Sequence, residues 1–192
     1  KEAIFHIAQS LVGRGKNKRH IIYPDPGYPV YKSSTVFAGG IPYPVRLSAE
    51  AGYLLEPWLL PISVQKDAAG LWLNYPHNPT GAILSEDDLK KLEKIAVDHN
   101  LIVLSDEVYE HIIFDGQQHQ SVCRFPKLAE RSLAVFSFGK TFHNTGWKMG
   151  YVVAPDYLMA EFRKVHQFNV FSVNTPVQYA IAEFLEDENN YL

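Results

Sequence analysis

The stretch from Leu101 to Glu107 reads LIVLSDE, four apolar residues followed by a serine and two acids. A short run that is wholly apolar is typical of a parallel strand buried on both faces of its sheet. The stretch from Ser132 to Lys140, SLAVFSFGK, repeats this arrangement and ends on a glycine and a lysine. Both stretches predict buried strands that end in chemically useful side chains.

Helical and strand-like segments alternate around these two runs. The apolar spacing predicts helices at residues 3–12 and 85–99, and Ser85 with Asp88 fits a capping box at the start of the second. Further strands, some of them closed by a proline turn, are predicted at residues 21–23, 41–47, 71–75 and 151–154. Strands separated by helices imply an α/β fold, with a mostly parallel sheet and helices on both faces.

The composition is that of a globular protein and excludes several other classes. The 192 residues include 11 Phe, 11 Tyr and 3 Trp, too many rings for a disordered, collagen-like or coiled-coil chain. A net charge of −3 argues against nucleic acid as a partner. No apolar run approaches the roughly 18 residues of a membrane span, so we expect no membrane partner.

Cysteine and basic residues carry little further information. The single cysteine, Cys123, excludes an intrachain disulfide framework and is typical of a reducing compartment, which favours a cytoplasmic protein. One local basic cluster is interpreted as a solvated loop; it comprises Arg14, Lys16, Lys18 and Arg19.

Polar residues follow four of the predicted strands. In parallel sheets the ligand lies outside the carboxyl ends of the strands, so these residues should share one rim: Asp25, Asn78, Asp106 and Lys140. An amine at this position, partly desolvated and near a second cation such as Lys148, can become nucleophilic toward an aldehyde. The position of Lys140 alone also fits an ordinary surface lysine.

Other familiar motifs fail on inspection. The sequence Gly-Lys-Thr at residues 139–141 lacks the first glycine of a phosphate-binding loop, because residue 134 is alanine. Gly-Arg-Gly at residues 13–15 lacks the third glycine of a dinucleotide fingerprint. The eight histidines form no H-E-x-x-H pattern and no pairing with cysteine, so we expect no metal site. Three of them are interpreted as packing or supporting groups, namely His77, His111 and His143.

Four motifs occur in a fixed order along the chain: NPTG at residues 78–81, SDEVY at 105–109, SFGK at 137–140 and GWKMG at 146–150. In this order they resemble the fold type I, pyridoxal-phosphate-dependent aminotransferases of class I/II, over essentially the whole chain. Residues 105–176 are most similar to the methionine/kynurenine-type branch. Residues 1–81, which include DPGYPVY at 25–31, are more similar to the diaminopimelate-type branch.

The resemblance implies a role for each motif residue. Lys140 would bond the aldehyde of pyridoxal phosphate and later move the substrate proton. Asp106 would keep the pyridine nitrogen protonated, and Tyr109 with Asn78 would hydrogen-bond the 3′ oxygen. Tyr28 would stack on the ring. A strand-end cap is the alternative for Asp106, and a plain core aromatic is the alternative for Tyr28.

Four further residues would bind the phosphate group. Ser137 and Lys148 correspond to the family's phosphate ligands, although the family usually has arginine where Lys148 stands. Asn174 matches a segment that reaches the phosphate of the neighbouring subunit, with a helix N-cap as the equal alternative. Lys1 would be the last residue of the family's phosphate loop.

These implications define the expected function. We expect transfer of an amino group between an L-amino acid and a 2-oxo acid in a homodimer. A C–S lyase of the same fold, the sensing domain of a regulator and a truncated or engineered non-catalytic core remain alternatives. Residues 1–192 would form part of the cofactor-binding large domain, with an antiparallel strand at 151–154, no N-terminal arm and no C-terminal small domain. Such a chain alone should be inactive. Cis peptide bonds are expected at Asn78–Pro79 and Asp25–Pro26.

Overall fold

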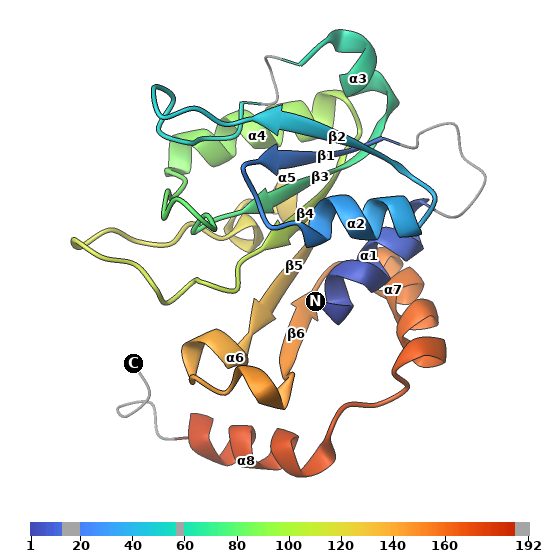
Figure 1. Cartoon of the computed structure of the whole chain (residues 1–192), viewed down its shortest axis with the longest axis vertical. Helices are drawn as coiled ribbons and strands as arrows, with labels where there is room; N and C mark the ends of the chain where they lie inside the picture. The colour runs from blue at the N-terminus through green and yellow to red at the C-terminus, as the bar shows by residue number, and fades with distance from the viewer. Residues whose placement is uncertain (13–19, 57–59, 187–192) are drawn as a thin grey trace.

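A six-stranded sheet is the centre of the molecule. The computed structural model describes residues 1–12, 20–56 and 60–186. The strands are β1 (His20–Asp25), β2 (Ile41–Arg46), β3 (Ala68–Asn74), β4 (Ile102–Asp106), β5 (Ser132–Ser137) and β6 (Gly150–Val153). Their order in space is β2-β1-β3-β4-β5-β6 (Figure 1). All neighbours run parallel except β6, which is antiparallel to β5, so the predicted sheet is confirmed.

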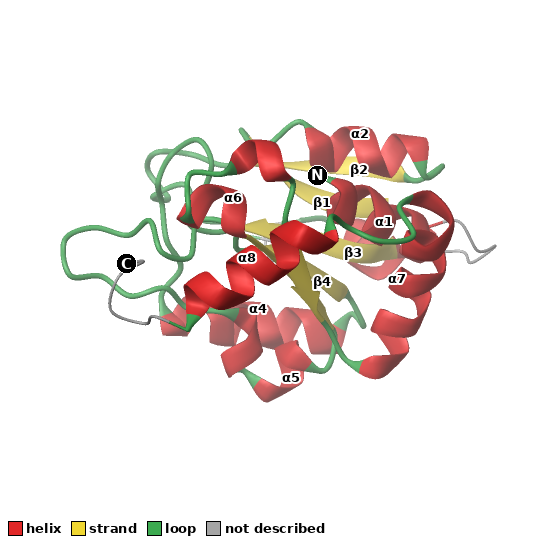
Figure 2. Ribbon diagram, turned by 90° about the horizontal axis from the view of Figure 1, so that it is seen from below, coloured by secondary structure: helices red, strands yellow, loops and turns green. Residues whose placement is uncertain are grey.

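Helices cover both faces of this sheet (Figure 2). One face is covered by α1 (Glu2–Val12), α2 (Val30–Phe37) and α7 (Asp156–Asn169). The other is covered by α4 (Glu86–Asp98) and α5 (Pro126–Ala129). The remaining elements are α3 (Ile62–Asp67), α6 (Phe138–Thr141), α8 (Thr175–Leu185) and the 3₁₀ turns η2 (Val122–Arg124) and η3 (Thr145–Trp147). No helix in the described part of the chain has both the length and the apolar character of a membrane span.

The two faces have separate hydrophobic cores, because successive strand residues point to opposite sides. In β3, Leu71 and Leu73 pack toward α4, whereas Trp72 packs toward α1 and α2. In β4, Val103 and Leu104 divide in the same way. A strand that is buried on both sides reads as an unbroken apolar run, which is why residues 101–104 predict it well.

Local signals explain which elements were predictable. The capping box that opens α4 is present, with the Ser85 hydroxyl accepting from the Asp88 N–H and the Asp88 carboxylate accepting from the Ser85 N–H. The helices α2 and α7 were not predicted. The sequence of α2, VYKSSTVF, is rich in β-branched and hydroxyl residues of weak helix propensity. In α7 only Leu158 and Phe162 are buried, so the apolar periodicity that would predict this helix is weak.

One prediction lies outside the described residues, namely the solvated basic loop at residues 14–19. Helix α8 ends at Leu185. The peptide bonds Asp25–Pro26 and Asn78–Pro79 are cis, as predicted, and Tyr75–Pro76 is a third cis bond that the sequence did not reveal.

Candidate active site

The carboxyl ends of β3, β4 and β5 form one rim. The sheet register pairs Asn74 with Asp106 and Asp106 with Val135, so these strand ends lie side by side. The turns that leave them carry the predicted site residues. Asp25, at the end of β1, is exposed, and with Tyr28 it lines an open hollow of about 520 Å³.

Three predicted residues meet directly above this rim. The Asn78 Nδ2 atom lies 3.5 Å from the Tyr109 hydroxyl oxygen, which puts two hydrogen-bond donors next to each other. The Lys140 Nζ atom lies 5.4 Å from the centroid of the Tyr109 ring. An amine and a pair of donors therefore converge on one point of the sheet edge.

Asp106, at the end of β4, is buried, with 3 % of its surface exposed. Its Oδ2 accepts a hydrogen bond from the Tyr31 hydroxyl at 2.7 Å, and its Oδ1 accepts from the Val108 N–H at 3.4 Å. Burial raises the pKa of Asp106, and the bond from Tyr31 acts against that rise. The bond from Val108 is the local strand-end cap considered above, but a cap alone does not require burial of the carboxylate.

Lys140 stands in α6, a four-residue helix that follows β5 directly. The Ser137 hydroxyl opens this turn by accepting from the Gly139 N–H at 3.2 Å. A side chain at Gly139 would place its Cβ 3.0 Å from the Thr145 Cα, so the close approach of the returning chain favours glycine. The Lys140 side chain is exposed, which differs from the partly desolvated amine that we expected. It follows a buried strand but projects beyond the core.

Tyr28 and Lys1 lie at the other side of the rim. The Lys1 Nζ atom is 5.7 Å from the centroid of the Tyr28 ring. Tyr28 is half-buried and presents its ring edge-on to Tyr31, with centroids 5.8 Å apart. Tyr28 is therefore neither a solvent-exposed nor a fully enclosed core aromatic.

The predicted phosphate residues are spread more widely. Lys148 is exposed, has a left-handed backbone (φ 56°) and donates from Nζ to the Thr145 carbonyl at 2.9 Å. Asn174 caps α8, since its Oδ1 accepts from the Val177 N–H at 3.2 Å. The helix-cap interpretation of Asn174 is thereby confirmed. Its contact with a second subunit stays a prediction, as do the ligand roles of Ser137, Lys148 and Lys1.

Two buried polar residues that the sequence analysis missed hold the rim together. Tyr31 binds Asp106, as described. Asn74 accepts the Asn78 N–H on its Oδ1 (3.1 Å) and donates from Nδ2 to the Asp106 carbonyl (3.2 Å), so it links the turn after β3 to β4. Asn74, like Asp106, is a polar residue at the end of an apolar strand, so the same pattern could have identified it.

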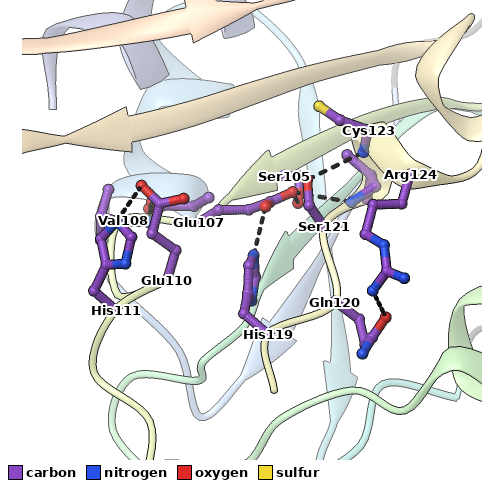
Figure 3. A network of polar contacts seen from close by, with 12 residues as sticks. Ser105, Glu107, Val108, Glu110, His111, His119, Gln120, Ser121, Cys123 and Arg124 are labelled. Carbon is purple, nitrogen blue, oxygen red and sulfur yellow. Dashed lines mark hydrogen bonds and ion pairs between the residues drawn. The ribbon is translucent and has the colours of Figure 1, made fainter. Parts of the chain in front are cut away.

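A third missed group lies next to Asp106 in sequence (Figure 3). The buried Glu107 carboxylate accepts from the Ser105 hydroxyl at 2.9 Å and the Val122 N–H at 3.2 Å, and it pairs with His119 Nε2 at 2.6 Å. These bonds close the loop that carries Tyr109. Within the described residues no three His, Cys, Asp or Glu side chains form a group able to hold a metal ion.

The three histidines beside the motifs differ from one another. His77 is buried, its Nδ1 lies 2.7 Å from the Thr80 hydroxyl, and burial lowers its pKa. His111 lies on the surface with Nε2 3.7 Å from Glu110. His143 is exposed in a turn with φ 55°. The packing interpretation is confirmed for His77, whereas His143 has no core role.

Comparison with known proteins decides the family. The family model described as "Aminotransferase class I and II" matches residues 5–192. This chain belongs to that family. The resemblance of the four motifs to these aminotransferases is thereby confirmed.

Curated relatives and solved structures agree with this assignment. The Escherichia coli methionine aminotransferase is 42 % identical over 188 residues, covering 97 % of this chain and 47 % of the relative. Human kynurenine–oxoglutarate transaminase 1 is 35 % identical (97 % and 46 % covered), and an LL-diaminopimelate aminotransferase from Natranaerobius thermophilus is 35 % identical (100 % and 49 %). The Escherichia coli structure reported with a methionine aminotransferase function superimposes with a TM-score of 0.89 at 40 % identity, covering 99 % of this chain and 49 % of that one. The chain spans about half the length of the relatives it matches.

Proposed function

We propose that the protein carrying this chain transfers an amino group between an L-amino acid and a 2-oxo acid, with pyridoxal 5′-phosphate as cofactor. The observation that carries the proposal is the rim itself, where a buried carboxylate, a pair of hydrogen-bond donors and an amine follow adjacent parallel strands. The relatives named as methionine, kynurenine and diaminopimelate aminotransferases support the reaction type. When bound, the cofactor supplies an electron sink for the charge left when the substrate Cα loses its proton.

The residues of the rim suit the charge pattern of that cofactor. Asp106 is a buried carboxyl group that, in its charged form, would accept a hydrogen bond from a protonated ring nitrogen. Tyr109 and Asn78 place two donors 3.5 Å apart, which suits a single ring oxygen. Tyr28 offers an aromatic face. Lys140 would supply the amine that holds the cofactor and the base for the substrate Cα proton.

The phosphate group would lie at the turn after β5. The Ser137 hydroxyl oxygen accepts from Gly139, which leaves its O–H able to donate to a phosphate oxygen. Lys148 uses one of its three N–H groups on Thr145 and can direct another at the same anion. Lys1 would contribute from the start of α1, and Asn174 would contribute from the neighbouring subunit of a homodimer.

Assembly and location follow from the same proposal. We place residues 1–192 in the cofactor-binding domain of a homodimeric enzyme. Cys123 is an exposed free thiol in the structure, which supports a reducing, cytoplasmic location.

The test uses the complete protein, stripped of cofactor and then titrated with pyridoxal phosphate. Glutamate formation from 2-oxoglutarate should depend on added cofactor, with methionine, an aromatic amino acid or diaminopimelate as donor. Release of ammonia and pyruvate without an acceptor would instead identify a C–S lyase. Failure to bind the cofactor at all would overturn the proposal.

A further inference from the structure

We infer that Tyr31 is a positioning residue for the proposed reaction: its hydroxyl holds the Asp106 carboxylate in place and in its charged form. The inference rests on the proposed function. The contact that carries it is the 2.7 Å hydrogen bond from the Tyr31 hydroxyl to Asp106 Oδ2, which joins the first turn of α2 to the end of β4. Tyr31 is fully buried, so water does not compete for this bond.

The ring of Tyr31 is fixed by aromatic contacts on the α1 side of the sheet. It stacks on Trp72, with centroids 4.8 Å apart and planes 23° apart, and it meets the Tyr28 ring edge-on. The Tyr31 carbonyl also accepts hydrogen bonds from the Ser34 and Thr35 hydroxyls, at 3.2 and 2.8 Å. Tyr31 therefore contacts both the acid proposed to bind the ring nitrogen and the aromatic proposed to stack on the ring.

The chemistry of Asp106 explains why a donor is needed there. A carboxylate removed from water tends to take up a proton, and a neutral Asp106 could not keep a ring nitrogen protonated. The carboxylate of Glu107 favours the neutral form of Asp106. The bond from Val108 is long, at 3.4 Å. Tyr31 is thus the close donor that favours the charged form. Because it binds Oδ2, Oδ1 can accept from the ring nitrogen beside its long bond from Val108.

Trp72 supports this interpretation independently. Its indole N–H is buried and has no hydrogen-bond partner among the described residues, an arrangement that is unfavourable in a core. A phenylalanine would avoid that unpaired donor but offers a smaller surface against Tyr31. Tryptophan at position 72 therefore gives the Tyr31 ring a larger stacking surface than phenylalanine would.

The experiment is Tyr31→Phe in the complete protein, with Tyr75→Phe as the matched control. The Tyr75 hydroxyl is also buried and bonded, donating to the Tyr53 carbonyl and accepting from the Leu55 N–H, but it lies in the core on the α4 side. Cofactor affinity is measured from pH 5 to 8 with pyridoxal phosphate and with its analogue in which the ring nitrogen is replaced by CH.

Tyr31→Phe should weaken pyridoxal phosphate binding about tenfold at pH 7. It should also move the acid limb of the binding profile to higher pH, because Asp106 then becomes protonated more readily. Binding of the nitrogen-free analogue should change less than about twofold, and Tyr75→Phe should affect neither ligand. An equal change for both ligands, or no change for either, would overturn the inference while leaving the proposed function intact. Absence of pyridoxal phosphate binding by the unaltered protein would overturn both.

A second variant keeps the test decisive if Tyr31→Phe does not fold. Trp72→Phe removes an unpaired buried donor and retains the Tyr31 hydroxyl, but it loosens the stacking that orients the tyrosine. It should move the acid limb in the same direction by a smaller amount, again only for pyridoxal phosphate. An unchanged limb in this variant would contradict the inference.

Discussion

The two halves of the rim are built in opposite ways. In the acid half, Asp106 is buried, and its partner Tyr31 belongs to the hydrophobic core. In the lysine half, Lys140 and Lys148 are exposed and stand on a short helix and a turn. The difference suits the role that we propose for each residue. A charge that tunes a ring nitrogen works best when it is fixed, whereas an amine that attaches a cofactor, gives way to a substrate and then carries a proton must move.

The lysine half is ordered in its backbone all the same. Gly139 and Thr145 lie in close contact, and the Thr145 hydroxyl donates to the Gly139 carbonyl at 3.0 Å. The backbone of the turn is thus held at its base, whereas the side chain of Lys140 is exposed. The acid half therefore holds a buried carboxylate with a buried partner, and the lysine half holds an exposed amine on an ordered turn.

The largest effect is expected for Lys140→Ala. Turnover of the complete protein should fall by about a thousandfold, since the variant lacks the base that we propose to move the proton. The melting temperature without cofactor should stay unchanged, because the side chain is exposed and buries little. Lys164→Ala, at an exposed lysine that pairs with Glu161 on α7, is the control and should leave turnover intact. A variant at residue 140 that still attached the cofactor through another lysine would contradict the assignment.

Asp106→Asn should have the next largest effect. The amide keeps the shape of the side chain, and its oxygen can still accept from Tyr31, so the fold should persist. Loss of the fixed charge should lower turnover by roughly 10²–10³-fold, the range found for a preorganised polar group in an active site. Steady-state kinetics together with circular dichroism check both statements. Near-normal turnover in a folded variant would show that Asp106 is only a strand-end cap.

The same division explains what the sequence could and could not predict. The strand runs, the capping box at Ser85 and the rim residues Asn78, Asp106 and Lys140 are local patterns or strand endings, and each was predictable. Tyr31 was not, because its partner is 75 positions away along the chain and its helix has weak propensity. The sequence likewise indicated that Lys140 follows a buried strand, but it did not reveal that the side chain itself is exposed.

A smaller, pH-dependent effect is expected at His6, in the helix that covers the acid half. His6 is buried, with its Nε2 2.7 Å from Asn169 Nδ2, and burial and nearby His166 lower its pKa while Glu2 acts weakly against this. Below pH 6.5, the ordinary pKa of histidine, residue 6 binds a proton in the unfolded chain. In the folded chain its pKa is lower, so folding disfavours the protonated form. The free energy of unfolding should therefore decrease as the pH falls through 6.5, with no such loss above it.

Urea denaturation at pH 7.5, 6.5 and 5.5 measures this loss. His6→Phe removes the titrating group and keeps an aromatic ring beside Phe162, so its decline between pH 6.5 and 5.5 should be shallower than that of the unaltered protein. Equal slopes for the two proteins would show that groups other than His6 cause the acid sensitivity.

The smallest effect is expected for Lys148→Arg, which tests the exposed half. Lysine is a point charge, whereas arginine can bond two oxygens of one phosphate group at once. The side chain is exposed and the left-handed backbone is equally strained in both residues, so the substitution should not disturb the turn. Affinity for pyridoxal phosphate should rise a few-fold, and affinity for pyridoxal, which lacks the phosphate, should stay the same. Equal gains for the two ligands would show that residue 148 acts on something other than the phosphate. A loss for pyridoxal phosphate alone would show that the bond from Lys148 to the Thr145 carbonyl matters more for the shape of the site than the charge does for binding.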